Sequence, residues 1–320
     1  MKAKPNQITI VIPCYNEEET IQLFWNELNK SIRSIVDYSF EFIFIDDGSI
    51  DNTLCLLKQL AAQDSRVRFL SLSRNFGKEA AMLAGLREAA GDYIAIMDAD
   101  LQDPPSLLSE MLKILSNDQY DCVGCCRMTR KGEPMLRSVF ARLFYKLINL
   151  VSSTKLVDGA RDFKMMKREV VTALISMPEY HRFSKGLYEW VGFSTKWLSY
   201  ENVERAAGET KWSFWKLLLY SMEGVVAFST APLALSSLLG LFFMLIAFAS
   251  IFYLCARQLC WHASVSGWTS LVCIIMLFCG IQLFCMGILG QYLAKTYMET
   301  KRRPHYIIKE QSMPIGNFFH

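Results

Sequence analysis

The 320-residue sequence predicts an α/β domain with a mostly parallel sheet, followed by a C-terminal hairpin of two transmembrane helices. In the N-terminal part, short apolar runs alternate with segments of helical spacing. Near the C-terminus, two long apolar stretches carry almost no charge. Charged residues make up 20% of the chain and mean hydropathy is +0.19, against about 25% charged residues in a typical soluble domain. These figures exclude a disordered or collagen-like chain.

Five apolar runs in the N-terminal part are typical of strands: Ile8–Tyr15, Phe40–Asp46, Val67–Ser73, Tyr93–Asp100 and Asp121–Cys126. Segments with helical spacing separate them: Glu18–Val36, Thr53–Gln63, Lys78–Ala90 and Pro105–Asn117. Strands that alternate with helices form βαβ units, whose parallel sheet is covered by helices on both faces. Ligands of such sheets bind beyond the carboxyl ends of the strands. Polar residues that follow the strands are therefore candidate site residues.

The loops after these strands do not match common nucleotide-binding motifs. No GxGxxG follows the first strand, which argues against a dinucleotide-binding fold. The segment Asn75–Ala81 (NFGKEAA) resembles a phosphate-binding loop only superficially, because GxxxxGK[ST] is not present. Hydride transfer and ATP hydrolysis are both disfavoured.

The segment Met97–Pro105 (MDADLQDPP) carries the clearest chemical signal. Asp98 and Asp100 stand at the end of a predicted strand, where alternate residues point the same way, so both carboxylates can converge on one cation. Mg²⁺ and Mn²⁺ prefer oxygen ligands and often bridge carboxylates to phosphates. Gln102 continues the alternation and could add an amide oxygen. The alternative is a solvated acidic turn in front of a helix.

The stretches Ala231–Ala256 and Trp268–Ala294 are each long enough to cross a bilayer, which needs about 20 apolar residues. Buried core helices are the alternative, but such helices usually show a polar face and these do not. Basic residues flank the pair, and the connecting turn carries only Arg257. The positive-inside rule then places both termini and the N-terminal domain in the cytoplasm.

The expected organisation has five parts: a cytoplasmic domain over 1–210, a juxtamembrane amphipathic helix over 211–228, transmembrane helices over 229–256 and 268–294, and a cytoplasmic basic tail over 295–320. Two segments, Met135–Ser152 and Trp212–Phe228, mix basic with aromatic and aliphatic residues at helical spacing. Such helices often lie at a membrane interface. A helix that packs on the core with a solvated basic face is the alternative.

Several motifs together resemble those of family 2 glycosyltransferases, which have the GT-A fold. They are Pro13–Ile21 (PCYNEEETI), Ile45–Thr53 (IDDGSIDNT), Ser73–Ala81 (SRNFGKEAA) and MDADLQDPP. The chain is most similar to the polyprenyl-phosphate glycosyltransferases, the group of dolichol-phosphate mannose synthase and the bactoprenol glucosyl transferases. Arg161–Val171, Ala206–Leu217 and Gly287–Lys309 extend this resemblance over nearly the whole chain.

The resemblance implies roles for individual residues. The nucleotide sugar would be held by Pro13, Tyr15, Glu17, Asp46, Asp47, Lys78 and Asp98. A divalent cation, Mg²⁺ or Mn²⁺, would be held by Asp98, Asp100 and Gln102. Asp100 and Asp162 would be catalytic, and phosphate groups, including that of the acceptor, would be bound by Arg127, Arg137 and Lys211. The chain departs from the family pattern at Arg161, in place of glycine, and at Lys164, in place of arginine.

For Asp162 the residues leave two roles open. It could orient the sugar or stabilise positive charge at the anomeric carbon, or it could cap the helix that follows it.

The implied activity is inverting transfer of a hexose to polyprenyl (undecaprenyl) phosphate on the cytoplasmic face of the cell membrane, with glucose from UDP-glucose as the first choice. The expected partners are a nucleoside diphosphate sugar, the lipid phosphate and the membrane. No nucleic acid is expected, and a homo-oligomer is left open.

Three alternatives remain beside this activity. The first is a mannosyltransferase that uses GDP-mannose. The second is a processive polysaccharide synthase, which is disfavoured because no QxxRW motif is present. The third is a non-catalytic, membrane-anchored scaffold that binds nucleotide sugars, and such a scaffold has no need for both cation-binding and acceptor-binding residues.

Overall fold

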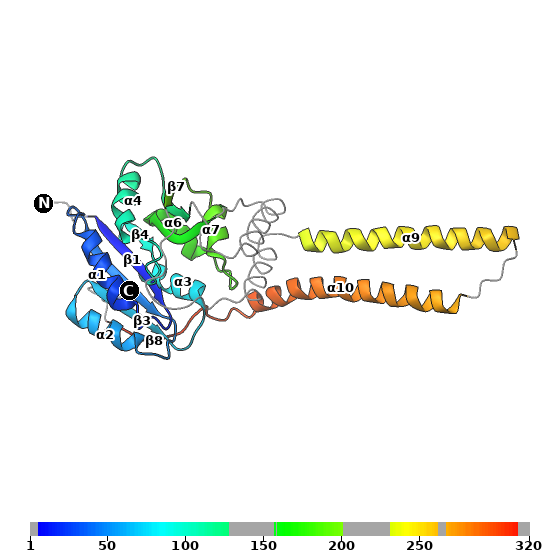
Figure 1. Cartoon of the computed structure of the whole chain (residues 1–320), viewed down its shortest axis with the longest axis horizontal. Coiled ribbons are helices and arrows are strands. Elements are labelled where there is room, and N and C mark those ends of the chain that lie inside the picture. Colours follow the sequence, from blue (N-terminus) through cyan, green and yellow to red (C-terminus); the bar gives the residue numbers. More distant parts are fainter. Residues whose placement is uncertain (1–5, 128–156, 158, 201–230, 262–266, 313–320) are drawn as a thin grey trace.

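The computed structural model describes residues 6–127, 157, 159–200, 231–261 and 267–312. An α/β domain lies at one end, and two long helices extend from it side by side (Figure 1). Both predicted amphipathic segments, over 135–152 and 212–228, lie outside the described residues.

Among the described residues, eight strands form one sheet at the centre of the domain, in the order β7-β5-β6-β4-β1-β2-β3-β8. The strands are β1 (Gln7–Cys14), β2 (Ser39–Asp46), β3 (Val67–Leu72), β4 (Tyr93–Ile96), β5 (Cys122–Arg127), β6 (Ala160–Lys167), β7 (Thr195–Tyr200) and β8 (Ile308–Gln311). β1 pairs in parallel with β2 and β4, as do β2 with β3 and β5 with β7. β6 is antiparallel to β4 and β5, and β8 is antiparallel to β3. The predicted α/β fold with a mostly parallel sheet is confirmed.

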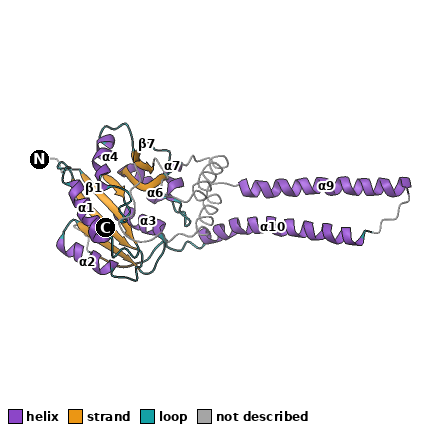
Figure 2. Cartoon of the chain, viewed as in Figure 1, coloured by secondary structure: helices purple, strands orange, loops and turns teal. Residues whose placement is uncertain are grey.

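Helices cover both faces of this sheet (Figure 2). The described helices are α1 (Ile21–Ile32), α2 (Thr53–Gln63), α3 (Lys78–Glu88), the short 3₁₀ helix η1 (Pro105–Leu107), α4 (Leu108–Leu115), α6 (Arg168–Ser176), α7 (Ser184–Trp190), α9 (Ala231–Trp261) and α10 (Trp268–Thr300). Alternate residues of a strand point to opposite faces. In β1, accordingly, Ile10 belongs to the same buried cluster as Phe24 of α1, and Val11 belongs to a second cluster with Met82 of α3.

The fourth strand is shorter than its apolar run predicts. β4 ends at Ile96, because its last partner on β6 is Lys164 and its last backbone contact with β1 joins Met97 N to Val11 O. Asp98 and Asp100 therefore lie in the loop after the strand. The expectation that strand alternation aligns their carboxylates was wrong.

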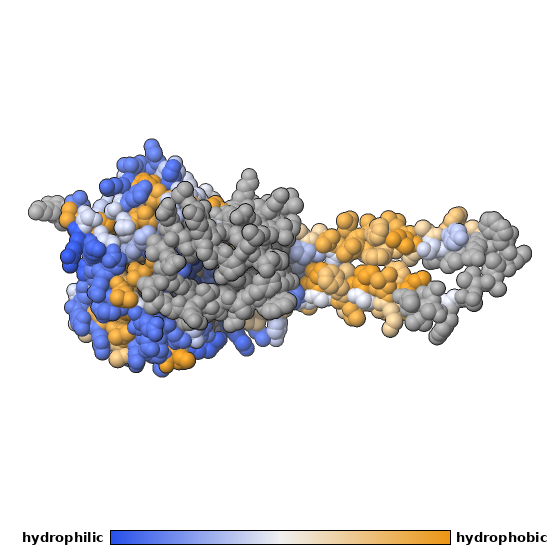
Figure 3. All heavy atoms as spheres, in the orientation of Figure 1, coloured by the Kyte–Doolittle hydropathy of each residue, from blue (hydrophilic) through white to orange (hydrophobic). Residues whose placement is uncertain are grey.

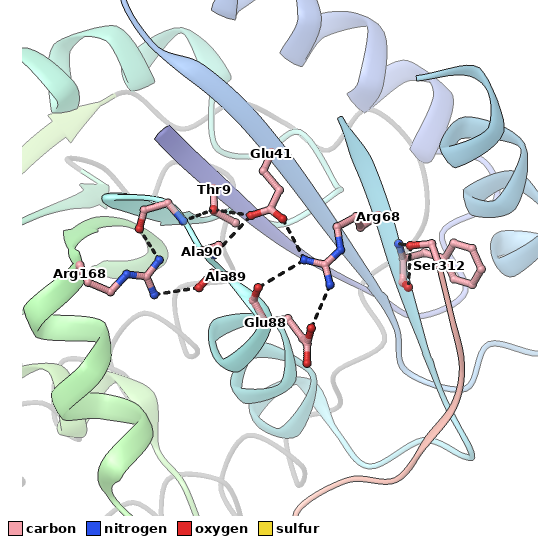
Figure 4. A network of polar contacts seen from close by, with 10 residues as sticks. Thr9, Glu41, Arg68, Glu88, Ala89, Ala90, Arg168 and Ser312 are labelled. Atoms are coloured by element: carbon pink, nitrogen blue, oxygen red, sulfur yellow. Dashed lines mark hydrogen bonds and ion pairs between the residues drawn. The ribbon is translucent and has the colours of Figure 1, made fainter. Parts of the chain in front are cut away.

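A buried polar network lies at the amino ends of the strands (Figure 4). Glu41 of β2 accepts hydrogen bonds from Thr9 Oγ1 (2.7 Å) and from Arg68 Nη1 (2.9 Å). Arg68 also donates to Glu88 (2.9 Å), at the end of α3, and Thr9 accepts from Gly91 N (2.9 Å). The network therefore connects β1, β2 and β3 to α3 and to the loop before β4. It lies at the opposite end of the sheet from the loops that follow the carboxyl ends of the strands.

On the face that Figure 3 shows, the side chains of α9 and α10 are mostly apolar. Candidate membrane spans run over Ala231–Ser250 and Ile274–Thr300, with mean hydropathies of 2.2 and 2.0. None of these window residues is buried inside the protein. Apolar side chains without protein cover are typical of helices that face lipid.

The chain returns to the α/β domain after α10. Glu299, near the end of α10, accepts a hydrogen bond from Tyr180 N (2.8 Å), and His305 Nε2 lies 2.8 Å from Glu179 O. β8 then extends the sheet beyond β3, where Glu310 forms an ion pair with Lys58 (2.7 Å). The end of the second apolar helix is thus attached to the sheet itself.

Candidate active site

A cleft of about 280 Å³ opens where the carboxyl ends of the parallel strands meet the start of α3. Residues from four segments line it: Pro13, Cys14, Tyr15 and Glu17 after β1, Asp47 after β2, Asn75, Gly77, Lys78 and Ala81 around the start of α3, and Asp98, Ala99 and Asp100 after β4. The parallel strand order brings these segments together, as the strand-end rule predicts. Seven of the predicted site residues line this cleft.

The two neighbouring acids at the end of β2 have different surroundings. Asp46 accepts from Ser49 N (3.1 Å) and from the Ser71 hydroxyl (2.9 Å), and it is not part of the cleft lining. Asp47 lines the cleft, and its two oxygens accept from Phe76 N (2.8 Å) and Gly77 N (2.9 Å). Burial outweighs these hydrogen bonds and raises the pKa of Asp47 to about 6. Asp46 shapes the turn, whereas Asp47 faces the space available to a ligand.

Lys78 is the first residue of α3 and bridges two carboxylates from different elements. Its Nζ lies 2.7 Å from the Asp98 carboxylate, in the loop after β4, and 2.5 Å from Asp162, on β6. Burial alone would lower the pKa of Lys78, but the charges of these two acids outweigh it and raise that pKa. Lys78 is therefore a cation at neutral pH.

Asp162 is held in its ionised form by its neighbours. Burial would raise the pKa of Asp162, but the charges of Lys78 and of Lys185 hold it well below the usual range. For Asp98, burial raises the pKa although Lys78 opposes the shift. Asp162 lies inside β6, and α6 begins only at Arg168 with Lys167 as its N-cap residue. The helix-capping alternative for Asp162 was wrong.

The loop after β4 supplies the oxygen atoms that could hold a divalent cation. Asp100 lines the cleft and accepts from Gln102 N (3.2 Å). The side-chain oxygen of Gln102 accepts from Arg161 Nη2 (3.0 Å), and Gln102 is not part of the cleft lining. Within the described residues, no group of three or more His, Cys, Asp or Glu side chains could hold a metal ion alone. The oxygen donors nevertheless fit Mg²⁺ or Mn²⁺, which are commonly bound by one or two carboxylates together with substrate phosphates.

The structure does not describe the side chains of the three basic residues predicted to meet phosphate. Arg127 is the last residue of β5, and its side chain is not described. Arg137 and Lys211 lie outside the described residues. Sequence reasoning missed Lys185, at the start of α7, whose Nζ donates to Ala160 O (2.9 Å) and whose charge acts on Asp162. No local sequence pattern indicates a role for Lys185, because only the tertiary fold brings α7 next to β6.

Fold and site together define a strand-end cleft with an anionic loop, suited to a phosphate-bearing ligand together with a hard cation. The model of the family described as "Glycosyl transferase family 2" matches residues 9–175. The chain belongs to glycosyl transferase family 2, and it has the GT-A fold that the sequence motifs implied.

The relatives span almost the whole chain. CsbB of Bacillus subtilis is 43% identical over 311 residues, covering 97% of this chain and 94% of that protein. The prophage bactoprenol glucosyl transferase homolog of Escherichia coli is 39% identical and covers 95% of this chain and 98% of that protein. The bactoprenol glucosyl transferase of Shigella phage SfV is 38% identical, over 95% and 99% of the two chains. Among solved structures, glucosyl-3-phosphoglycerate synthase from Mycobacterium tuberculosis is similar over 69% of this chain and 78% of that chain, at 18% identity and a TM-score of 0.45.

Proposed function

We propose that this glycosyltransferase is a membrane-bound, inverting enzyme that moves a hexose from a nucleoside diphosphate sugar to polyprenyl (undecaprenyl) phosphate. Glucose from UDP-glucose is the first choice, because two relatives that cover 95% of the chain are named for bactoprenol glucosyl transfer. The observation that carries the proposal is the ion pair between Asp162 and Lys78 (2.5 Å), because Lys78 also lines the cleft beside Asp98 and Asp100. A carboxylate at this place suits chemistry that develops positive charge on a sugar.

The donor would lie in the cleft with its base and ribose toward the loops after β1 and β2. Pro13, Tyr15, Glu17 and Asp47 line that part of the cleft. The diphosphate would reach the loop after β4, where Asp98 and Asp100 would hold Mg²⁺ or Mn²⁺. Gln102, the third predicted ligand, lies outside the cleft lining and its side-chain oxygen accepts from Arg161, so it would support this loop instead. Such an ion, when bound, neutralises the departing diphosphate as a Lewis acid. The Lys78 ammonium adds a second positive charge at the same end of the cleft.

The acceptor needs little activation by the protein. A phosphate monoester has its second pKa at about 6, so it is largely a dianion at pH 7. One of its oxygens attacks the anomeric carbon and forms a new C–O bond, while the bond from that carbon to the donor diphosphate breaks. The electron pair leaves with the nucleoside diphosphate, and a single displacement inverts the anomeric configuration. Arg127, Arg137 and Lys211 are proposed to hold the acceptor phosphate and to limit repulsion between the two anions.

Asp162 acts on the sugar in this proposal. Its carboxylate stays ionised because Lys78 and Lys185 lie close to it. A fixed negative charge stabilises an anomeric carbon that becomes positive as the donor bond breaks, and it can also accept a hydrogen bond from a sugar hydroxyl. The protein thereby orients the donor and favours its transition state without a proton transfer.

The apolar helices would keep the enzyme at its lipid substrate. α9 and α10 contain the two candidate spans, over 20 and 27 residues. We infer that they cross the cell membrane, that the catalytic domain and both termini face the cytoplasm, and that the segments over 135–152 and 211–228 lie at the interface. A polyprenyl chain stays in the bilayer, so an anchored enzyme meets it by diffusion in two dimensions.

The test supplies membranes containing the protein with undecaprenyl phosphate, Mg²⁺ or Mn²⁺, and one radiolabelled donor at a time. UDP-glucose is expected to give a labelled product that is extracted into organic solvent, whereas GDP-mannose gives little. Labelled lipid from GDP-mannose alone would assign the mannosyltransferase alternative. If the protein binds donors but gives no labelled lipid from any of them, the catalytic proposal is wrong and the scaffold alternative takes its place.

A further inference from the structure

Arg161 makes a buried ion pair that the reaction described above does not use. Its Nε donates to Asp103 Oδ1 (2.9 Å), and its Nη2 donates to the side-chain oxygen of Gln102 (3.0 Å). The side chain of Asp103 is completely buried, and that of Arg161 is 20% exposed. The Tyr200 hydroxyl, at the end of β7, donates to the same oxygen of Asp103. Residues of β6 and β7 thus hold the far end of the loop that contains Asp98 and Asp100.

This loop contains a residue with an unfavourable backbone conformation. Leu101 has a φ of 56°, in the left-handed region that residues other than glycine rarely adopt. The residues on either side of it are linked by the hydrogen bond from Gln102 N to Asp100 Oδ1 (3.2 Å). A backbone in an unfavourable conformation persists when its surroundings fix it. The contacts of Arg161 and Tyr200 with the two residues after Leu101 provide such surroundings.

We propose that Arg161 is a positioning residue that holds the Asp98–Asp103 loop so that the Asp100 carboxylate faces the cleft and can bind the divalent cation. The inference rests on the proposed function. It adds a residue that supports the cation-binding loop without binding the cation itself. Arg161 is a member of neither the cleft lining nor the predicted cation ligands. Its guanidinium donates to Asp103 and Gln102, and neither of these residues is part of the cleft lining.

Charge alone does not explain this arrangement. The planar fork of the arginine guanidinium donates hydrogen bonds in fixed directions. Here Nε donates to the Asp103 carboxylate, and Nη2 donates to the Gln102 side-chain amide oxygen. Lysine carries the same charge but donates from a single atom, so it can restore the ion pair with Asp103 without restoring the contact with Gln102. The variants Arg161→Ala and Arg161→Lys therefore separate loss of both contacts from loss of the fork.

The experiment measures Mn²⁺ binding to the purified full-length protein in detergent, with UDP present, by the loss of the free Mn²⁺ electron paramagnetic resonance signal. Residues that support metal ligands typically change metal affinity about 10- to 100-fold when they are replaced. Arg161→Ala is expected to weaken Mn²⁺ binding about 10- to 100-fold, and Arg161→Lys to give an intermediate value. Lys167→Ala is the matched control, because Lys167 is also on β6 but pairs with exposed Asp118, and it is expected to bind Mn²⁺ like the wild type.

Tyr200→Phe tests the same loop from β7, and it keeps the inference testable if Arg161→Ala does not fold. It removes one donor to Asp103 with little change of volume, and it is expected to weaken Mn²⁺ binding less than Arg161→Ala does. Wild-type affinity, or tighter binding, in folded Arg161→Ala would overturn the inference while leaving the proposed function intact. If the wild type itself bound no Mn²⁺ with UDP present, the proposed cation site would fall and the inference with it.

Discussion

Glu41 is the acceptor at the centre of the buried network, and its removal is expected to destabilise the α/β domain strongly. Glu41→Ala leaves Arg68 buried with Glu88 as its remaining carboxylate partner in the network. It also removes the acceptor for the Thr9 hydroxyl. Breaking a buried ion pair from one side costs about 3–5 kcal/mol. Because Glu88 still pairs with Arg68, we expect the lower end of this range, about 3 kcal/mol.

The assay is thermal unfolding of the full-length protein in detergent, followed by near-ultraviolet circular dichroism. For a domain of 150–250 residues, 1 kcal/mol shifts Tm by about 2–4 °C, so Glu41→Ala is expected to lower Tm by about 6–12 °C. Lys58→Ala is the control, because the Lys58–Glu310 pair is exposed and such pairs contribute about 0–1 kcal/mol. The double variant Glu41→Met, Arg68→Met should recover most of the loss, since apolar residues often replace a buried pair without cost.

If Glu41→Ala lowered Tm no more than Lys58→Ala does, the reasoning about the buried pair would be refuted. Activity provides a second check. The network lies at the amino ends of the strands, away from the cleft, so KM for the donor should stay unchanged at temperatures below both transitions.

Two further changes test the cleft, and a third tests the turn after β2. Asp100→Asn should lower kcat about 10²- to 10³-fold with Tm unchanged, because the cation that stabilises the leaving diphosphate loses its carboxylate; initial rates and a thermal melt measure both. Asp47, with its pKa raised to about 6 by burial, is ionised above pH 6 and can then accept a hydrogen bond from the nucleoside. UDP affinity should therefore fall as the pH drops through 6, and a calorimetric titration of Asp47→Asn should show no such fall. Gly48→Ala should cost about 2–4 kcal/mol in a denaturant melt, because φ is 67° and a Cβ would lie 2.4 Å from the Arg74 carbonyl carbon.

The sequence predicts the parallel half of the sheet well, because its strands are short apolar runs between amphipathic helices. It predicts none of β6, β7 and β8 as strands. β6 carries Lys164 in its buried middle, which interrupts the apolar pattern. β8 has the sequence IKEQ and is held by backbone pairing with β3 rather than by burial of its own side chains. Contacts between distant parts of the chain leave no local pattern.

The site residues that could be predicted are those with a local sequence signal, and those brought in by long-range pairing could not. Asp47, Lys78, Asp98 and Asp100 follow strands or begin a helix, so the strand-end rule and the motifs bring them to one edge. Asp162 came only from the resemblance, because β6 reaches that edge by antiparallel pairing. The contact of Arg161 with Asp103 joins residues 58 positions apart and has no sequence signal.

The fate of the nucleotide tests the central claim most directly. With UDP-glucose labelled in both the uridine and the glucose, the wild-type protein should release one UDP for each glucose that enters the lipid, and Asp162→Asn should release far less of either product. Release of UMP, with the sugar phosphate found in the lipid, would show that a phosphoryl group is transferred. UDP release without labelled lipid would show hydrolysis, and either result would contradict glycosyl transfer to a polyprenyl phosphate.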